Sequence, residues 1–105
     1  MEPANIDAIR DALAVSNAIV LDVRGEEEAA RIGNSVDGSI KFEYKNDDSV
    51  FIQEIVAVLP TDKSTPIVCH WNKGGRAGKA ALAIQSMGYS NVHNGVSGSH
   101  IKSAL

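Results

Sequence analysis

The sequence predicts an α/β fold in which a mainly parallel sheet is covered by helices on both faces. Two observations lead to this fold class. Short apolar runs alternate along the chain with segments of helical periodicity, and strands separated by helices pair in parallel. The run at 18–23 (AIVLDV) is almost continuously apolar and rich in β-branched residues, as expected for a strand buried on both faces. With 105 residues, the chain is long enough for one core, and we expect a single domain over 1–105.

Five elements are expected before Pro60, which ends the last of them because proline cannot continue a helix. Asn5 can cap the first helix, and Asp47 or Asp48 can cap the third. In order, we expect a helix over 6–16, a strand over 18–23, a short acidic helix over 26–30, a strand over 39–44 and a helix over 48–59.

The second half of the chain opens with a short apolar strand that begins at Pro66 and ends at Cys69. A polar, glycine-containing loop follows, and then a helical pattern over 76–87 that Gly88 stops. After it we expect a strand over 91–94, a flexible loop containing Gly95, Ser97 and Gly98, and a brief terminal helix over 99–105.

A reactive thiol is indicated where this central strand meets its loop. Ligands of parallel sheets bind just outside the carboxyl ends of the strands, and Cys69 is expected at one such end. Gly74 and Gly75 let the loop backbone approach a ligand, while Lys73 and Arg76 bring two cations near the thiol. We therefore expect a thiol pKa below the ordinary ~8.5, and an edge position where replacing Cys69 leaves the fold intact. A small buried hydrophobe is the alternative interpretation of a lone cysteine.

Asp22 and Arg24 end an earlier strand beside this expected site. We interpret them as supporting residues that brace a neighbouring loop, or that pair Arg24 with Glu26 or Glu28, rather than as direct substrate contacts. The acidic run 26–28 as a whole is expected to be a solvated face.

The composition excludes several classes of function. A net charge of −3 without a basic stripe argues against nucleic-acid binding. No apolar run reaches the ~18 residues of a membrane helix and the N-terminus has no signal-peptide pattern, so we expect no membrane partner. The single cysteine excludes an internal disulfide and fits a reducing, cytoplasmic location. His70, His93 and His100 with Cys69 match no zinc spacing, so no metal is expected.

Four motifs resemble those of the rhodanese family of sulfurtransferase modules. They are IVLDVR at 19–24, SVDGSI at 35–40, PIVCH at 66–70 and GGRAGKAALAIQSMGYSNVHNG at 74–95. The resemblance covers nearly the full length of the chain. It implies a three-layer rhodanese-like domain with a central, mainly parallel sheet of about five strands flanked by helices.

In the activity that this resemblance implies, the Cys69 thiolate attacks the outer sulfur of thiosulfate or a similar small anionic donor and becomes a persulfide. A thiol, cyanide or a protein acceptor then takes the sulfur, and no cofactor takes part. Loop side chains and backbone N–H groups hold the donor. The substrate-binding residues implied in this way are His70, Trp71, Asn72, Lys73, Gly74, Gly75 and Arg76.

The spacing between the cysteine and the loop arginine departs from the family pattern. Rhodaneses usually place this arginine about four to five positions beyond the cysteine, whereas Arg76 lies seven beyond Cys69. Longer loops are typical of related phosphatases and arsenate reductases, so a cysteine enzyme of that kind is one alternative. A non-catalytic binding module whose loop contacts a protein, for instance through Trp71, is another. Ser35 also stands where many members have a histidine.

Overall fold

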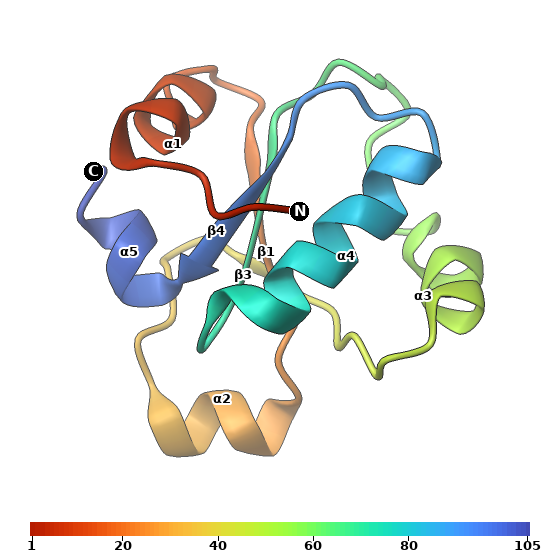
Figure 1. The fold of residues 1–105 in the computed structure, drawn as a ribbon, viewed down its shortest axis with the longest axis horizontal. Coiled ribbons are helices and arrows are strands. Elements are labelled where there is room, and N and C mark those ends of the chain that lie inside the picture. The colour runs from red at the N-terminus through yellow and green to blue at the C-terminus, as the bar shows by residue number, and fades with distance from the viewer.

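The computed structural model describes residues 1–105, and its strands form one parallel sheet in the order β2–β1–β3–β4 (Figure 1). The strands are β1 (Ile19–Asp22), β2 (Ile40–Lys41), β3 (Ile67–Trp71) and β4 (Val92–Ser97). The sheet thus has four strands rather than the expected five or so. Beyond β4 the N-terminal segment adds only an isolated bridge between Pro3 and Asn94, so no fifth strand forms at that edge. The expected parallel α/β class is confirmed.

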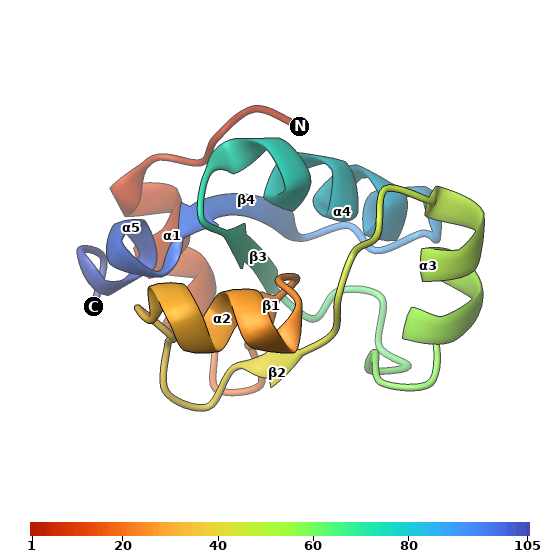
Figure 2. The same ribbon diagram turned by 90° about the horizontal axis from the view of Figure 1, so that it is seen from below.

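Five helices surround this sheet: α1 (Ile6–Leu13), α2 (Glu26–Ile32), α3 (Asp48–Ile55), α4 (Gly74–Ser86) and α5 (Gly98–Lys102). Helices α1 and α5 cover one face, whereas α3 and α4 cover the other (Figure 2). Helix α2 lies beyond the carboxyl ends of the strands, below the sheet in Figure 1. The three expected layers are therefore present, and one further helix lies at the end where parallel sheets bind ligands.

The helix starts follow the expected caps, although several ends differ. The side chain of Asn5 accepts a 2.8 Å hydrogen bond from the backbone of Ala8, and Asp47 accepts one of 3.2 Å from Val50. Helix α3 ends at Ile55, and residues 56–58 form turns rather than the expected further helical turn.

The most consequential difference concerns β3 and α4. Strand β3 extends two residues beyond its expected end at Cys69, and α4 begins two residues before its expected start at Arg76.

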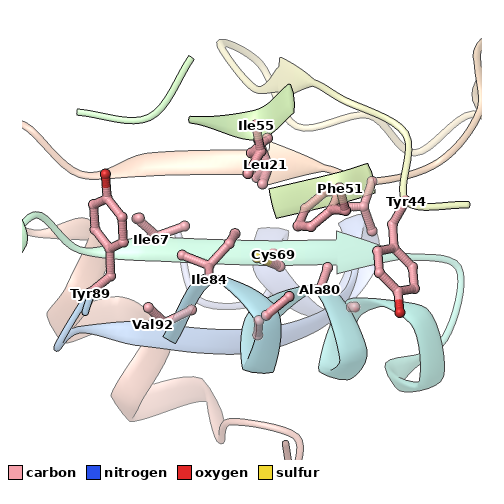
Figure 3. Close-up of a cluster of buried hydrophobic side chains, with 14 of the residues drawn as sticks. Leu21, Tyr44, Phe51, Ile55, Ile67, Cys69, Ala80, Ile84, Tyr89 and Val92 are labelled. Carbon is pink, nitrogen blue, oxygen red and sulfur yellow. The ribbon is translucent and has the colours of Figure 1, made fainter. Parts of the chain in front are cut away.

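Two apolar clusters pack against opposite faces of the sheet. The larger contains 15 buried residues between the sheet and α3 and α4, and Figure 3 shows part of it. Strand β3 contributes to both clusters because its side chains alternate: Cys69 joins the larger one and Val68 the smaller. The larger cluster also takes Ala77, Ala80 and Ala81 from α4, whose small side chains let this helix lie close to the sheet.

The start of α5 lies in close contact with the loop that follows α2. Gly98 is buried there, and a Cβ atom at this position would overlap the carbonyl oxygen of Asn34. Asn34 has a φ of 59°, a left-handed conformation that asparagine adopts more readily than most residues. Because the obstacle is backbone, it cannot move aside by changing a rotamer. This close approach fixes the loop after α2 against the carboxyl end of β4.

We predict that Gly98→Ala lowers the free energy of unfolding by about 2 kcal/mol or more, because overpacking against fixed atoms costs ~1–3 kcal/mol. Gly75→Ala is the matched control. Nothing lies within 4 Å of its Cβ position, and alanine favours the helix, so stability should hold or rise by up to ~1 kcal/mol. Urea unfolding measures both variants. Equal stabilities would contradict the close contact at Gly98.

Candidate functional site

Cys69 lies inside the core rather than at the mouth of a loop. It is the third residue of β3, pairs in register with Leu21 and Asn94, and has no exposed surface. Its side chain lies in the larger apolar cluster, near Ala80 and Ile84 (Figure 3). Burial raises the pKa of the thiol to about 12. The expectation of an accessible thiol with a lowered pKa is therefore wrong, whereas the catalytic role of Cys69 itself stays a prediction.

Strand β3 continues through two residues that the sequence placed in the loop. His70 pairs with Asp22 of β1, and its carbonyl oxygen accepts a 3.0 Å hydrogen bond from the backbone of Val23. Trp71 pairs with Ser97 of β4 and is the last residue of the strand. These backbone pairings continue the strand past Cys69, so the sulfur lies well before the carboxyl end of the sheet.

The loop after β3 is consequently short. Only Asn72 and Lys73 separate the strand from α4, so the expected long loop between cysteine and arginine is wrong. Gly74 opens the first turn of α4, and Arg76 follows within that turn. Arg76 lies five positions after Trp71, which is within the usual family spacing between the catalytic cysteine and the loop arginine. By position, therefore, Trp71 occupies the place where a rhodanese nucleophile is expected.

His70 lies on the opposite face of the sheet from Cys69 because neighbouring strand residues alternate. It has no exposed surface, and neither ring nitrogen has a hydrogen-bond partner. Burial lowers its pKa despite the attraction of the nearby Asp22 carboxylate. The expectation that His70 lies in the loop is therefore wrong, and its contact with a substrate stays a prediction that its burial in β3 does not favour. Lys73, in contrast, is exposed at the N-terminal cap of α4.

Trp71 and Arg76 stack on each other at the sheet's carboxyl end. The guanidinium carbon of Arg76 lies 4.7 Å from the centre of the Trp71 ring. The indole Nε1 of Trp71 is buried and has no hydrogen-bond partner. A hollow of about 110 Å³ opens beside the ring. It is lined by Arg24, Ile32, Asn34, Trp71, Asn72, Ser97, Gly98 and Ser99.

Glu28 of α2 lies over residues 71–76, here called the 71–76 segment, and contacts two of its side chains. Asn72 Nδ2 donates a 3.0 Å hydrogen bond to Glu28 Oε2, and Arg76 Nη1 lies 3.8 Å from Glu28 Oε1. Glu28 is half-buried, whereas Glu26 and Glu27 are exposed as expected. The expectation of a solvated face is thus wrong for Glu28. Sequence reasoning missed this residue, although a helix that directly follows a strand end starts over the ligand-binding edge of a parallel sheet.

Asp22 and Arg24 form a buried ion pair at the end of β1. Their side chains are 0% and 1% exposed. Arg24 donates from Nε to Asp22 Oδ1 and from Nη2 to Asp22 Oδ2, both at 2.9 Å, and its backbone N–H also donates to Oδ1. Burial opposes ionisation of this carboxyl, but the hydrogen bonds from Arg24 hold the pKa of Asp22 below its ordinary value.

The remaining donors of Arg24 brace two loops, while its role as a supporting residue of a functional site stays a prediction. Nη1 donates to the carbonyl of Gly33 at 2.6 Å and to Asn72 Oδ1 at 3.3 Å, while Nη2 donates to Ser35 Oγ at 3.3 Å. Arg24 does not pair with Glu28 directly, because Asn72 lies between them. The structure therefore brings Arg24, Trp71, Asn72 and Arg76 together, but keeps Cys69 and His70 apart from them.

Asn94 is a second residue that sequence reasoning missed. It is 1% exposed, and its Nδ2 donates to the carbonyls of Met1 at 2.9 Å and Gly74 at 3.0 Å. Its Oδ1 accepts a 3.0 Å hydrogen bond from Val96, which has a φ of 67° in an irregular stretch of β4. Asn94 thereby ties the N-terminal segment, the start of α4 and β4 together. Its place in an expected strand of the sheet was the only signal for it, because a polar side chain buried there needs hydrogen-bond partners.

The histidines are distributed singly, and no group of three or more His, Cys, Asp or Glu side chains is arranged to hold a metal ion. None of the five helices combines the length and the apolar composition needed to cross a bilayer.

The chain belongs to the rhodanese-like domain family, whose model matches residues 5–104. No curated protein matches the chain. Among solved structures, the rhodanese-like domain of a protein from Anabaena sp. is similar with a TM-score of 0.61 and 17% identity, over 90% of this chain and 67% of that chain. An uncharacterised protein from Saccharomyces cerevisiae gives a TM-score of 0.60 and 22% identity, over 89% and 82% of the two chains.

A human protein described as a single-domain sulfurtransferase, TSTD1, is also similar. Its TM-score is 0.60 and its identity 22%, over 90% of this chain and 88% of that chain. At these identities the likeness establishes the rhodanese fold. The family match and the fold together confirm the resemblance seen in the four sequence motifs.

We predict that Cys69→Ser lowers the free energy of unfolding by about 1–3 kcal/mol, because its hydroxyl would be buried among apolar side chains without a partner. Cys69→Ala, which buries no polar group, should cost less. Urea unfolding compares the two variants. In the native wild type, iodoacetamide should modify Cys69 only through opening of the fold, so fast alkylation without denaturant would contradict the buried position.

We predict that the wild type loses stability as the pH falls below ~6.5, the ordinary value at which the unfolded chain protonates His70. The folded protein binds this proton only at lower pH, so the stability present above ~6.5 is lost as the pH falls toward the folded pKa. Each unit of pKa lowering corresponds to about 1.4 kcal/mol. Urea unfolding at pH 7.5 and 5.5 measures the loss, which His70→Phe should reduce. Identical losses in wild type and variant would show that His70 does not cause it.

Proposed function

We propose that this chain is a rhodanese-like binding module that recognises a partner protein through the 71–76 segment and does not use Cys69 as a nucleophile. The single observation that carries this proposal is that Trp71, and not Cys69, occupies the end of β3. Trp71 lies where the strand passes into the loop, five residues before Arg76, whereas Cys69 lies in the core. A lone buried thiol also fits the cytoplasmic location that we propose for the protein.

The chemistry of Cys69 favours this reading over persulfide formation. Nucleophilic attack requires a thiolate that a donor can reach. With a pKa of about 12, the thiolate fraction at pH 7 is on the order of one in 100,000. A thiosulfate ion would in addition have to enter an apolar cluster, where a charge without partners is strongly disfavoured.

The surface around Trp71 suits a protein contact. Tryptophan and arginine are among the residues enriched at the energetic centres of protein interfaces, and here the two stack at 4.7 Å. The adjacent hollow of about 110 Å³ is smaller than the ~300–1,000 Å³ typical of small-molecule sites. Its size fits one side chain of a partner better than a whole metabolite.

A Cys69-dependent sulfurtransferase, acting on thiosulfate or a similar donor, is the second candidate, and membership in the rhodanese-like family favours it. The phosphatase-like alternative loses its support, because that hypothesis depended on an enlarged loop. Mass spectrometry of the intact protein after thiosulfate treatment separates the first two candidates. The binding module should gain no sulfur, whereas a cyanide-removable sulfur on Cys69 would establish the sulfurtransferase.

We predict that Trp71→Cys, made together with Cys69→Ala, gains the ability to take sulfur from thiosulfate. The new thiolate would attack the outer sulfur, the S–S bond of thiosulfate would break with release of sulfite, and a persulfide would form on residue 71. The same mass measurement detects one added sulfur atom that cyanide removes. The matched control is Cys69→Ala alone, which keeps Trp71 and should gain none. A Trp71→Cys protein that folds but gains no sulfur would argue against residue 71 as the nucleophile position.

A further inference from the structure

We propose that the open edge of β2 binds an extended, basic segment of a partner protein, which adds to the sheet as a further strand. This surface lies along the side of the sheet, whereas the 71–76 segment lies at the carboxyl end of β3. The inference therefore goes beyond the proposed function and does not depend on it. It rests on backbone groups without partners, on the hollows beside them and on the charge of the surrounding side chains.

Strand β2 is an outermost strand of the sheet, and one of its two sides is open. Figure 2 shows no helix or strand beyond it. On the inner side, the backbone of Phe42 donates a 2.9 Å hydrogen bond to the carbonyl of Asp22. The backbone of Tyr44 donates one of 3.0 Å to the carbonyl of Val23. The chain therefore stays paired with β1 beyond the end of β2 at Lys41.

The outward backbone groups of this stretch have no partner within the chain. Successive residues of a strand direct their N–H and C=O groups to alternate sides, so Glu43, between Phe42 and Tyr44, faces away from β1. Neither its N–H nor its C=O makes a hydrogen bond within the chain, and the same holds for Lys45. Such a row of unpaired groups on an exposed edge is the template to which an extended peptide adds.

Hollows beside Glu43 give room for the side chains of an added strand. One of about 520 Å³ lies at the start of α2, and its lining includes Glu26 and Glu27 but no apolar side chain. A narrower one of about 50 Å³ lies toward α3 and includes Phe42 and Val50. Because alternate residues of a strand point to opposite faces, a segment that alternates charged and apolar side chains fits both hollows.

The charges along this edge are predominantly negative and favour a basic occupant. The exposed carboxylates that line the hollows are those of Glu26, Glu27, Glu43, Asp47 and Glu54, and the exposed cations are Arg31, Lys41 and Lys45. None of these carboxylates forms an ion pair within the chain. A basic segment would supply cations for them, whereas a second copy of this chain would bring the same excess of negative charge. The charge therefore favours a different protein over a second copy.

Substitutions of Glu43 separate the backbone contribution from the charge. Glu43→Pro removes the outward N–H together with the carboxylate, and proline is tolerated on an edge strand where its nitrogen faces solvent. Glu43→Gln removes the charge but keeps the N–H. Glu2→Gln is the matched control, because Glu2 is exposed in the N-terminal segment, next to the residue that bridges to β4 at the opposite edge of the sheet.

The test titrates isotope-labelled protein with a short synthetic peptide of alternating arginine and valine and follows the NMR signals. In the wild type, the amide signals of 41–45 should shift, while the indole signal of Trp71, the only tryptophan, should stay unchanged. Glu43→Gln should bind about threefold more weakly, because one exposed ion pair is lost. Glu43→Pro should bind at least ~tenfold more weakly, because a backbone hydrogen bond is lost as well. Glu2→Gln should bind as the wild type does.

A second measurement leaves the protein unchanged. Peptides that are N-methylated at the valines or at the arginines carry the same charge but lose opposite sets of N–H donors. An added strand pairs with β2 through only one of these sets. One methylated peptide should therefore bind at least ~tenfold more weakly than the other.

Three results would overturn the inference: no binding by the wild type at ~1 mM peptide, equal affinities of the two methylated peptides, or a shift of the Trp71 signal instead of those of 41–45. A dimer of the protein alone that Glu43→Pro dissociates would also overturn it, by assigning the edge to a second copy. Failure of the proposed function is measured separately, as a cyanide-removable sulfur on Cys69 after thiosulfate treatment. That result would leave peptide binding at β2 unchanged.

Discussion

The buried ion pair between Asp22 and Arg24 is the interaction on which the carboxyl end of the sheet depends. Arg24 compensates the buried negative charge of Asp22 at the end of β1. Its guanidinium also donates to the carbonyl of Gly33, the hydroxyl of Ser35 and the side-chain oxygen of Asn72. Removing one member of such a pair typically costs ~3–5 kcal/mol, because the other is left buried and uncompensated. Domains are stable by only ~5–15 kcal/mol, so this loss would remove a large part of the stability. Through the hydrogen bonds of Arg24, the pair also sets the geometry of three separate segments.

From this pair a continuous series of polar contacts runs outward to solvent. Arg24 orients Asn72, Asn72 donates to Glu28, and Glu28 lies beside Arg76, which stacks on Trp71. The series connects β1, α2 and the start of α4, and none of its members is a thiol. This carboxyl end of the sheet is where we propose recognition of a partner by charge and stacking, and by position it is where a rhodanese enzyme would carry its nucleophile.

The sequence was sufficient for the parallel α/β fold and the caps at Asn5 and Asp47, because each depends on local periodicity or on residues close in the chain. The length of β3 was not predictable in this way. His70 is polar, and a polar residue after an apolar run indicates a loop unless the partners on the neighbouring strands are known. Glu28 could not be distinguished from Glu27 for a similar reason, since the orientation of α2 over the 71–76 segment is set by tertiary packing.

The position of Cys69 shows that depth along a strand matters as much as the face to which a side chain points. Cys69 and Trp71 are two residues apart, so both point to the same face of the sheet and pack against the larger cluster. At ~3.3 Å per residue, however, the sulfur lies roughly 6.6 Å farther back along β3 than the residue at its end. Such a shift preserves the motif of cysteine, glycines and arginine in the sequence while removing the thiol from the surface. Membership in this fold, even with a cysteine near the loop, therefore does not identify a thiol enzyme until the register of the central strand is known.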